Sequence, residues 1–140
     1  MGKIHRFIGH DNTFDWEGQK IVSYGEADGA KRASLRWILG PFERSPHFAL
    51  RYVQIEPGGW SSLDQHVHDH GVFVVRGRGR VRHGEEESDI TYGDVVYIPS
   101  NETRQFINTG HEPFGFLCII PQKRLLRELK AVELSPDEEE

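Results

Sequence analysis

The chain has little cysteine and no long apolar run. Cys118 is the single cysteine among 140 residues, so an intrachain disulfide or a cysteine-rich zinc site cannot form, and a metal ion would need histidine or carboxylate ligands. No stretch approaches the roughly 18 apolar residues of a membrane span, and no apolar core of a signal peptide follows the first residues. We therefore expect a cytoplasmic protein with no membrane partner.

An excess of positive charge is also missing. The formal net charge is −5, with 28% charged residues, which removes the broad basic surface that binding to a phosphate backbone requires. We therefore expect no nucleic-acid partner. The length of 140 residues suits one domain with a single core.

What the sequence does have is a regular alternation of short apolar runs and turn residues. Its 15 glycines and 7 prolines are spread along the chain, and the spacing of the runs is typical of an all-β barrel or sandwich. The pattern predicts strands at 33–39, 48–55, 60–67, 72–76, 80–83, 95–98, 104–108 and 114–120. It predicts a turn at 56–59 and a hairpin loop at 77–79.

The periodicity changes near the end of the chain. Leu125, Leu126, Leu129 and Val132 are spaced as one face of a short amphipathic helix. The predicted organisation is an N-terminal arm or strand at 1–32, a barrel at 33–121, a C-terminal helix at 122–134 and a disordered acidic tail at 135–140.

Four potential ligands alternate along one segment: Asp64, His66, His68 and His70. Alternate residues of a strand share a face, but a straight strand would hold the outer two about 20 Å apart, so convergence on one ion requires a bend. One interpretation is an exposed strand with surface histidines. Three histidines within five residues, beside a carboxylate, favour a metal or ligand site. Two imidazoles with a carboxylate match a facial non-haem iron site, and the same atoms would accept zinc, manganese, nickel or copper.

Two spacings in the sequence resemble the two motifs of the cupins, small double-stranded β-helix barrels also called jelly rolls. The first is Gly58, five residues, Asp64-Gln65-His66, three residues, His70, six residues and Gly77. The second is Gly93, five residues, Pro99-Ser100-Asn101, two residues, Arg104, three residues and Asn108. The resemblance covers about residues 33–121 and implies an all-β jelly-roll barrel, to which the C-terminal helix is added.

The resemblance also implies one divalent metal ion inside the barrel. Of the four family metal positions, only His66 carries the usual residue. Asp64 replaces a histidine, His70 replaces a glutamate and Arg104 replaces the last histidine. An arginine stays protonated and cannot coordinate a metal, so the ligand set predicted here is Asp64, His66 and His70, with His68 as a less favoured fourth.

Two interpretations of the cavity remain open. In the first, these side chains hold a metal ion while Arg104 binds an anionic substrate on its open side. In the second, Asp64 and Arg104 form a salt bridge across the barrel, and the remaining histidines retain little metal. Residues that share a strand face with these positions are predicted to line the same cavity: Trp60, Ser62, Phe106 and Asn108.

The resemblance implies several functions, because one fold hosts many. We expect binding of a small, anionic molecule by an oxygenase-like metalloenzyme, with isomerase and lyase activities as related possibilities. The alternative is a non-catalytic module that binds or senses a small molecule. Exposed strands of an open jelly roll also favour a homodimer.

Overall fold

The structure is a computed structural model that describes residues 2–9, 13–18, 21–24, 29–40 and 45–122. The elements within these ranges are strands: β1 (Ile21–Tyr24), β2 (Lys31–Leu39), β3 (Phe48–Trp60), β4 (His70–Arg76), β5 (Arg78–His83), β6 (Glu86–Thr91), β7 (Val95–Ile98), β8 (Arg104–Asn108) and β9 (Phe114–Pro121). Of these, the sequence pattern did not predict β6 and left β1 open as an arm or strand. Apart from Gln122, the helix predicted at 122–134 and the tail predicted at 135–140 lie outside the described residues. The described residues contain no helix that could cross a bilayer.

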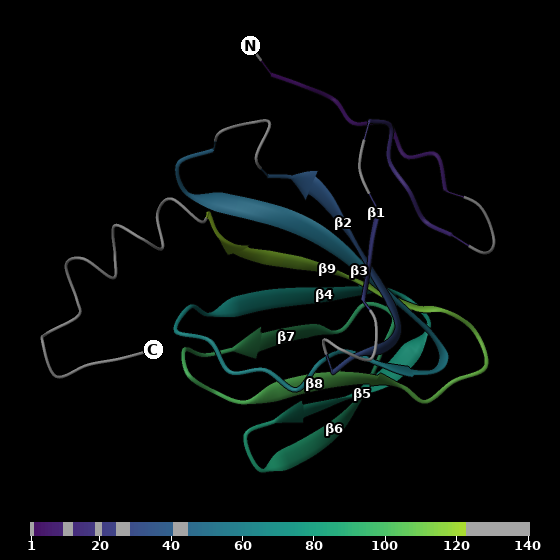
Figure 1. The fold of residues 1–140 in the computed structure, drawn as a ribbon, viewed down its shortest axis with the longest axis vertical. Coiled ribbons are helices and arrows are strands. Elements are labelled where there is room, and N and C mark those ends of the chain that lie inside the picture. The colour runs from purple at the N-terminus through teal and green to yellow at the C-terminus, as the bar shows by residue number, and fades with distance from the viewer. Residues whose placement is uncertain (1, 10–12, 19–20, 25–28, 41–44, 123–140) are drawn as a thin grey trace, which may run out of the picture.

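The strands form one curled antiparallel sheet. Its hydrogen-bonded order is β6-β5-β8-β3-β9-β4-β7, while β2 pairs with β3 and β1 with β2. Neighbours in the sheet are mostly not neighbours in sequence, because the chain crosses repeatedly from one wall to the other, as in a jelly roll. Figure 1 shows the result, with β2, β3, β9 and β4 in the upper wall and β8, β5 and β6 in the lower one.

The predicted hairpin loop at 77–79 is wrong. β4 pairs with β7 and β9, and β5 pairs with β6 and β8, so the chain turns a corner between the two walls here. Gly77 has φ +70°, and a Cβ on this residue would lie 2.3 Å from the carbonyl oxygen of Pro113. Glycine at this position therefore permits both the backbone conformation and the close approach of the neighbouring chain.

The turn predicted at 56–59 and the strand predicted at 60–67 also need correction. β3 continues through the first of these segments to Trp60, with an irregularity in its pairing with β2 near Lys31 and Ala33. Gly58 there has φ +81°, as expected of a bulge that needs a left-handed residue. The following residues, 61–69, are irregular, and Asp64 makes an isolated bridge to Arg104.

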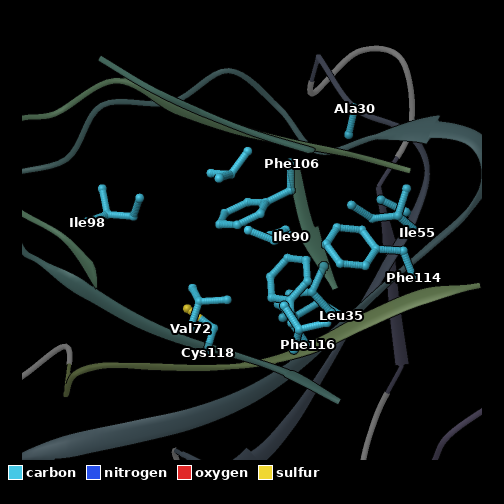
Figure 2. Close-up of a cluster of buried hydrophobic side chains, with 14 residues drawn as sticks. Ala30, Leu35, Ile55, Val72, Ile90, Ile98, Phe106, Phe114, Phe116 and Cys118 are labelled. Atoms are coloured by element: carbon cyan, nitrogen blue, oxygen red, sulfur yellow. The ribbon is translucent and has the colours of Figure 1, made fainter. Parts of the chain in front are cut away.

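The core follows from alternation along the strands. In β9 the inward side chains are apolar over most of the strand, and two of its rings pack with Phe106 of β8. The centroids of Phe106 and Phe116 lie 4.5 Å apart, and those of Phe114 and Phe116 lie 5.3 Å apart. Figure 2 shows these rings between the two walls, with Leu35 and Ile55 beside them. Burial of this cluster is the main stabilising contribution to the barrel.

The N-terminal segment covers part of the outer face of the sheet. Phe14 stacks on Tyr52 of β3 with centroids 5.7 Å apart, and Trp16 lies 5.3 Å from the same ring. The hydroxyl of Tyr52 donates a hydrogen bond of 2.9 Å to Gln54, and burial raises its pKa to about 12. This segment therefore shields Tyr52 from solvent.

Candidate functional site

The irregular segment between β3 and β4 is fixed by backbone contacts to the lower wall. The amide of Asp64 donates to the carbonyl of Arg104 at 2.9 Å, and the amide of Arg104 donates back at 2.8 Å. The amide of Asn101 donates to the carbonyl of His66 at 2.6 Å. The segment therefore places Asp64 and His66 opposite β8, where sequence reasoning alone could only require a bend.

A cavity of about 190 Å³ opens between the walls at this end of the barrel. Six of the residues that the sequence predicted for the site lie on its lining: Ser62, Asp64, His66, His70, Arg104 and Phe106. The other lining residues come from β2, β3 and β9 and the start of the irregular segment: Ala33, Leu35, Arg51, Val53, Ser61, Phe116 and Cys118. The lining thus combines apolar walls with a small set of polar groups, as ligand sites generally do.

His70 is the centre of the polar network. It is 5% exposed, its Nε2 lies 2.7 Å from Nη2 of Arg104 and its Nδ1 lies 3.2 Å from the sulfur of Cys118. Because a guanidinium can only donate, Nε2 must accept, so the proton of the neutral ring is on Nδ1 and points at the sulfur. Burial, and then the charges of Arg104 and Arg51, lower the pKa of His70 to about 2. The ring is therefore uncharged at neutral pH.

The three histidines of the cluster do lie together. The ring centroids of His66, His68 and His70 are 4.7 to 5.9 Å apart, with interplanar angles of 10° to 21°. Burial is the main cause that lowers the pKa of His68 to about 4, followed by the charges of His66 and Arg104. A metal ion must lie about 2.0–2.1 Å from every ligating nitrogen. Stacked, near-parallel rings at these separations do not converge on one such point.

Arg104 is buried without a carboxylate at its guanidinium. The side chain is 6% exposed, and burial lowers its pKa from the ordinary value, while the negative charge of Asp64 raises it. Among the described residues, the side chains of Asp64 and Arg104 do not form an ion pair; the two backbone hydrogen bonds connect these residues instead. Asp64 accepts a hydrogen bond from the hydroxyl of Ser62. The salt bridge of the second interpretation is therefore not formed.

The arrangement of donors does not fit a bound divalent ion. Within the described residues, no group of three or more histidine, cysteine, aspartate or glutamate side chains is placed to hold one. Both ring nitrogens of His70 are engaged, one of them by a cation. The predicted ligand set of Asp64, His66, His70 and His68 thus shares one region, with its three imidazole rings stacked and His70 bonded to Arg104 and Cys118.

Two predicted lining residues lie elsewhere. Trp60 ends β3 and is 37% exposed, with the ammonium of Lys31 5.2 Å from its ring centroid. Asn108 is buried, but its amide donates to the carbonyls of Ile55 and Glu112, each at 2.8 Å, and its oxygen accepts from the amide of Gly110. The side chain of Asn108 therefore holds the β8–β9 connection together.

Sequence reasoning missed Ser61 and also the one further charged residue of the cavity lining, Arg51. Its guanidinium lies 3.4 Å from the sulfur of Cys118 through Nη2 and 5.4 Å from the ring centroid of Trp37. Arg51 belongs to neither motif. The sequence feature that could have identified Arg51 as a cavity residue is its position in β3. It shares a face with Val53 and Ile55 in a strand that is otherwise apolar on that side.

Comparison with known proteins identifies the family. The family model described as a cupin domain matches residues 51–120, which include all the cavity-lining residues except the two from β2. The chain belongs to the cupin family. A relative from Rhodospirillum rubrum, named 1-methylthio-D-xylulose 5-phosphate methylsulfurylase, is 34% identical over 115 residues, which are 81% of this cupin and 72% of the relative.

Two solved cupin structures agree with this assignment. A cupin-2 domain from Rhodospirillum rubrum has a TM-score of 0.72 and 29% identity, covering 87% of this chain and 88% of its own. A cupin 2 conserved barrel domain protein from Rhodopseudomonas palustris has a TM-score of 0.66 and 30% identity, covering 83% and 86% respectively. The cupin barrel is therefore the fold of this protein, and its interior cavity is where a ligand site is to be sought.

Proposed function

We propose that this cupin binds a small organic anion in its cavity, with Arg104 as the principal contact. The observation that carries the proposal is a buried guanidinium that donates to a neutral imidazole rather than to a carboxylate. A buried cation without a counter-ion is destabilising, and an anion on the cavity side would compensate its charge with charge-assisted hydrogen bonds.

The similarity to the Rhodospirillum rubrum protein supports an anionic ligand. That relative is named for a sugar 5-phosphate, and a phosphate ester is a small organic anion. A carboxylate would satisfy the same guanidinium, because arginine recognises both groups through the same pair of parallel donors. We therefore propose a class of ligand, a small organic anion that carries a phosphate or a carboxylate group, and no specific substrate.

The same contact would give the cavity a proton acceptor. His70 is neutral, and its Nε2 lone pair is held by Arg104. An anion that draws the guanidinium to itself would release this lone pair and, through its own negative charge, raise the low pKa of the ring, which could then accept a proton from the bound molecule. Proton abstraction of this kind suits an isomerase or a lyase. Under this proposal, His70→Gln retains anion binding and loses the proton transfer.

Calorimetric titration of the full chain tests anion binding. We expect Arg104→Gln to weaken the binding of acetate, succinate and glycerol 3-phosphate by about tenfold or more, the effect of losing a charge-assisted hydrogen bond. Arg80→Gln is the matched control, because Arg80 is exposed on β5 and pairs with Asp89 at 3.1 Å. Unchanged affinity in Arg104→Gln would reject the proposal.

A second candidate is the oxygenase-like metalloenzyme that the family resemblance implies. The observation that favours it is the approach of three imidazole rings to within 5.9 Å of one another, with Asp64 on the same cavity. It requires Arg104 to leave His70. Elemental analysis of protein purified without added metal tests it: a stoichiometric metal that His66→Ala or His70→Ala removes, and that His83→Ala retains, would support this candidate.

We also propose a homodimer that pairs through the exposed edge at β7. Side chains on this edge and on the adjoining strands are apolar and accessible: Phe73 at 43%, Val95 at 74%, Tyr97 at 65% and Ile119 at 46% exposed. An accessible strand edge with apolar neighbours favours association. Light scattering coupled to gel filtration should give twice the mass of one chain for the wild type. The Val95→Lys variant should give the mass of one chain. A wild-type protein with the mass of one chain would contradict the dimer.

A further inference from the structure

A second guanidinium faces the same cavity as Arg104. Arg51 on β3 is paired in register with Cys118 on β9 and with Trp37 on β2, so the three side chains stand in one row on the inner face. The aromatic ring and the sulfur hold the guanidinium at 5.4 Å and 3.4 Å. Its Nε is buried without a hydrogen-bond partner.

The two arginines are linked by neutral groups. Arg104 contacts His70 at 2.7 Å, His70 contacts Cys118 at 3.2 Å, and Cys118 contacts Arg51 at 3.4 Å. Arg104 and Arg51, at the two ends of this series of contacts, are cations. His70 and Cys118, which lie between them, are uncharged or weakly polar. The imidazole and the sulfur therefore separate the two positive charges without compensating either of them.

Negative charge on the cavity lining is limited to one carboxylate. Asp64 is the acidic residue among the lining side chains, and within the described ranges the ion pairs include neither Arg51 nor Arg104. The positive charge of Arg51 contributes to lowering the pKa values of His70 and Arg104. Among the described residues, the cavity lining thus carries two cations and one anion, in a region that water screens poorly.

We propose that Arg51 and Arg104 together form a two-point receptor that selects a small dianion over a monoanion of the same size. This inference rests on the proposed anion-binding function and adds the charge of the ligand. The shared chemistry is two negative charges on one small molecule, either a phosphate monoester or a dicarboxylate. Each guanidinium offers several donors in a fixed plane, and both Arg51 and Arg104 lie on the lining of the cavity.

The test compares ligands that differ in one charge. Succinate is titrated against monomethyl succinate, and glycerol 3-phosphate against its methyl diester, by calorimetry on the full chain at pH 7.5. In the wild type each dianion should bind about tenfold or more tightly than its monoanionic partner. The pair that shows the larger preference identifies the source of the dianion as a carboxylate or a phosphate ester.

Variants assign this preference to Arg51. Arg51→Gln should lose most of the dianion preference while the affinity for monoanions changes by less than about threefold, whereas Arg51→Lys should retain the preference. Arg104→Gln should weaken both classes of ligand. Arg80→Gln is the control, and circular dichroism melts establish that each variant is folded.

The outcomes separate this inference from the function on which it rests. A dianion preference that survives in Arg51→Gln, or a wild type that binds both members of each pair equally, would overturn the two-point receptor and leave anion binding at Arg104 intact. A wild type that binds neither class would overturn both. Loss of the preference in Arg51→Gln and its retention in Arg51→Lys would establish the role of the second charge.

Discussion

The two ends of the barrel interior are built from the same strands and differ in chemistry. On β8, Phe106 at one end and Arg104 at the other are two residues apart and share a face. β4, β3 and β9 repeat the change, with apolar residues giving way to His70, Arg51 and Cys118. The apolar end stabilises the fold, while the polar end introduces buried charge that opposes folding. This division indicates that stability and binding can be altered separately in this cupin.

The apolar end should show the largest loss of stability on substitution. Phe114 is 0% exposed and packs against Phe116, so Phe114→Ala should lower the free energy of unfolding by about 3–5 kcal/mol. Urea denaturation followed by fluorescence measures it. Phe48→Ala, at a residue that is 43% exposed, is the control and should lower it by about 1 kcal/mol or less. Equal losses in the two variants would contradict the placement of the core.

A smaller loss is expected where a polar residue serves the fold. Asn108 makes three hydrogen bonds of 2.8 Å to backbone groups of the β3 and β8–β9 segments, and Asn108→Ala should cost about 2 kcal/mol of unfolding free energy. Anion affinity should stay within about twofold of the wild type. Thr109→Ala, at the exposed neighbouring residue, should leave stability nearly unchanged. A variant that lost affinity and kept stability would instead assign Asn108 to the cavity.

Acidification should lower the free energy of unfolding through His70, a buried histidine at the polar end of the barrel. The pKa of His70 is about 2 in the folded chain against its ordinary 6.5, so below pH 6.5 the unfolded chain binds a proton that the folded chain does not. Stability therefore falls as the pH drops below about 6.5, by up to about 1.4 kcal/mol per pH unit from this group, and is independent of its titration above that pH.

The measurement is a series of urea midpoints between pH 4 and pH 8 on protein treated with a chelator. His70→Gln should reduce the slope below pH 6.5 by about half, because His68, with its pKa lowered to about 4, contributes in the same direction and remains. His83→Gln, at a partly exposed histidine that bonds Ser88, should keep the wild-type slope. The same slope in His70→Gln and the wild type would show that other groups dominate the acid response.

Removing the buried cation should affect stability least. Arg104→Met replaces a guanidinium that lacks a carboxylate partner with an apolar chain of similar length, so the free energy of unfolding should change by less than about 1 kcal/mol or rise. Anion binding should be lost in the same variant. A loss of stability comparable to that of Phe114→Ala would mean that Arg104 is a structural residue.

Much of the fold could be predicted from sequence because its signals are local. Alternation and turn residues predict most of the strands, and the motif spacing placed Arg104 and His70 in the same cavity. The pairing partners of β4 and β5 could not be predicted, because the corner at Gly77 depends on the approach of Pro113 from a distant segment. The same glycine signal fits a hairpin and a corner equally well.

The site was harder to predict, for a different physical reason. Spacing determines which side chains approach one another, and it brought Asp64, His66 and His70 to one cavity. It does not determine where ring nitrogens point, and Nε2 of His70 faces Arg104. Arg51 lies outside both motifs and reaches the cavity through strand pairing across β2, β3 and β9. Its charge was therefore absent from the sequence-based account.

The central claim is that the guanidinium groups of the polar end bind a small anion without the help of a metal ion. Calorimetric titration of chelator-treated protein with succinate and with glycerol 3-phosphate, repeated after one equivalent of manganese or zinc, tests it most directly. We expect one anion to bind per chain in the metal-free protein, with an affinity that the added metal does not improve. Binding that appears only after the metal is added would contradict it.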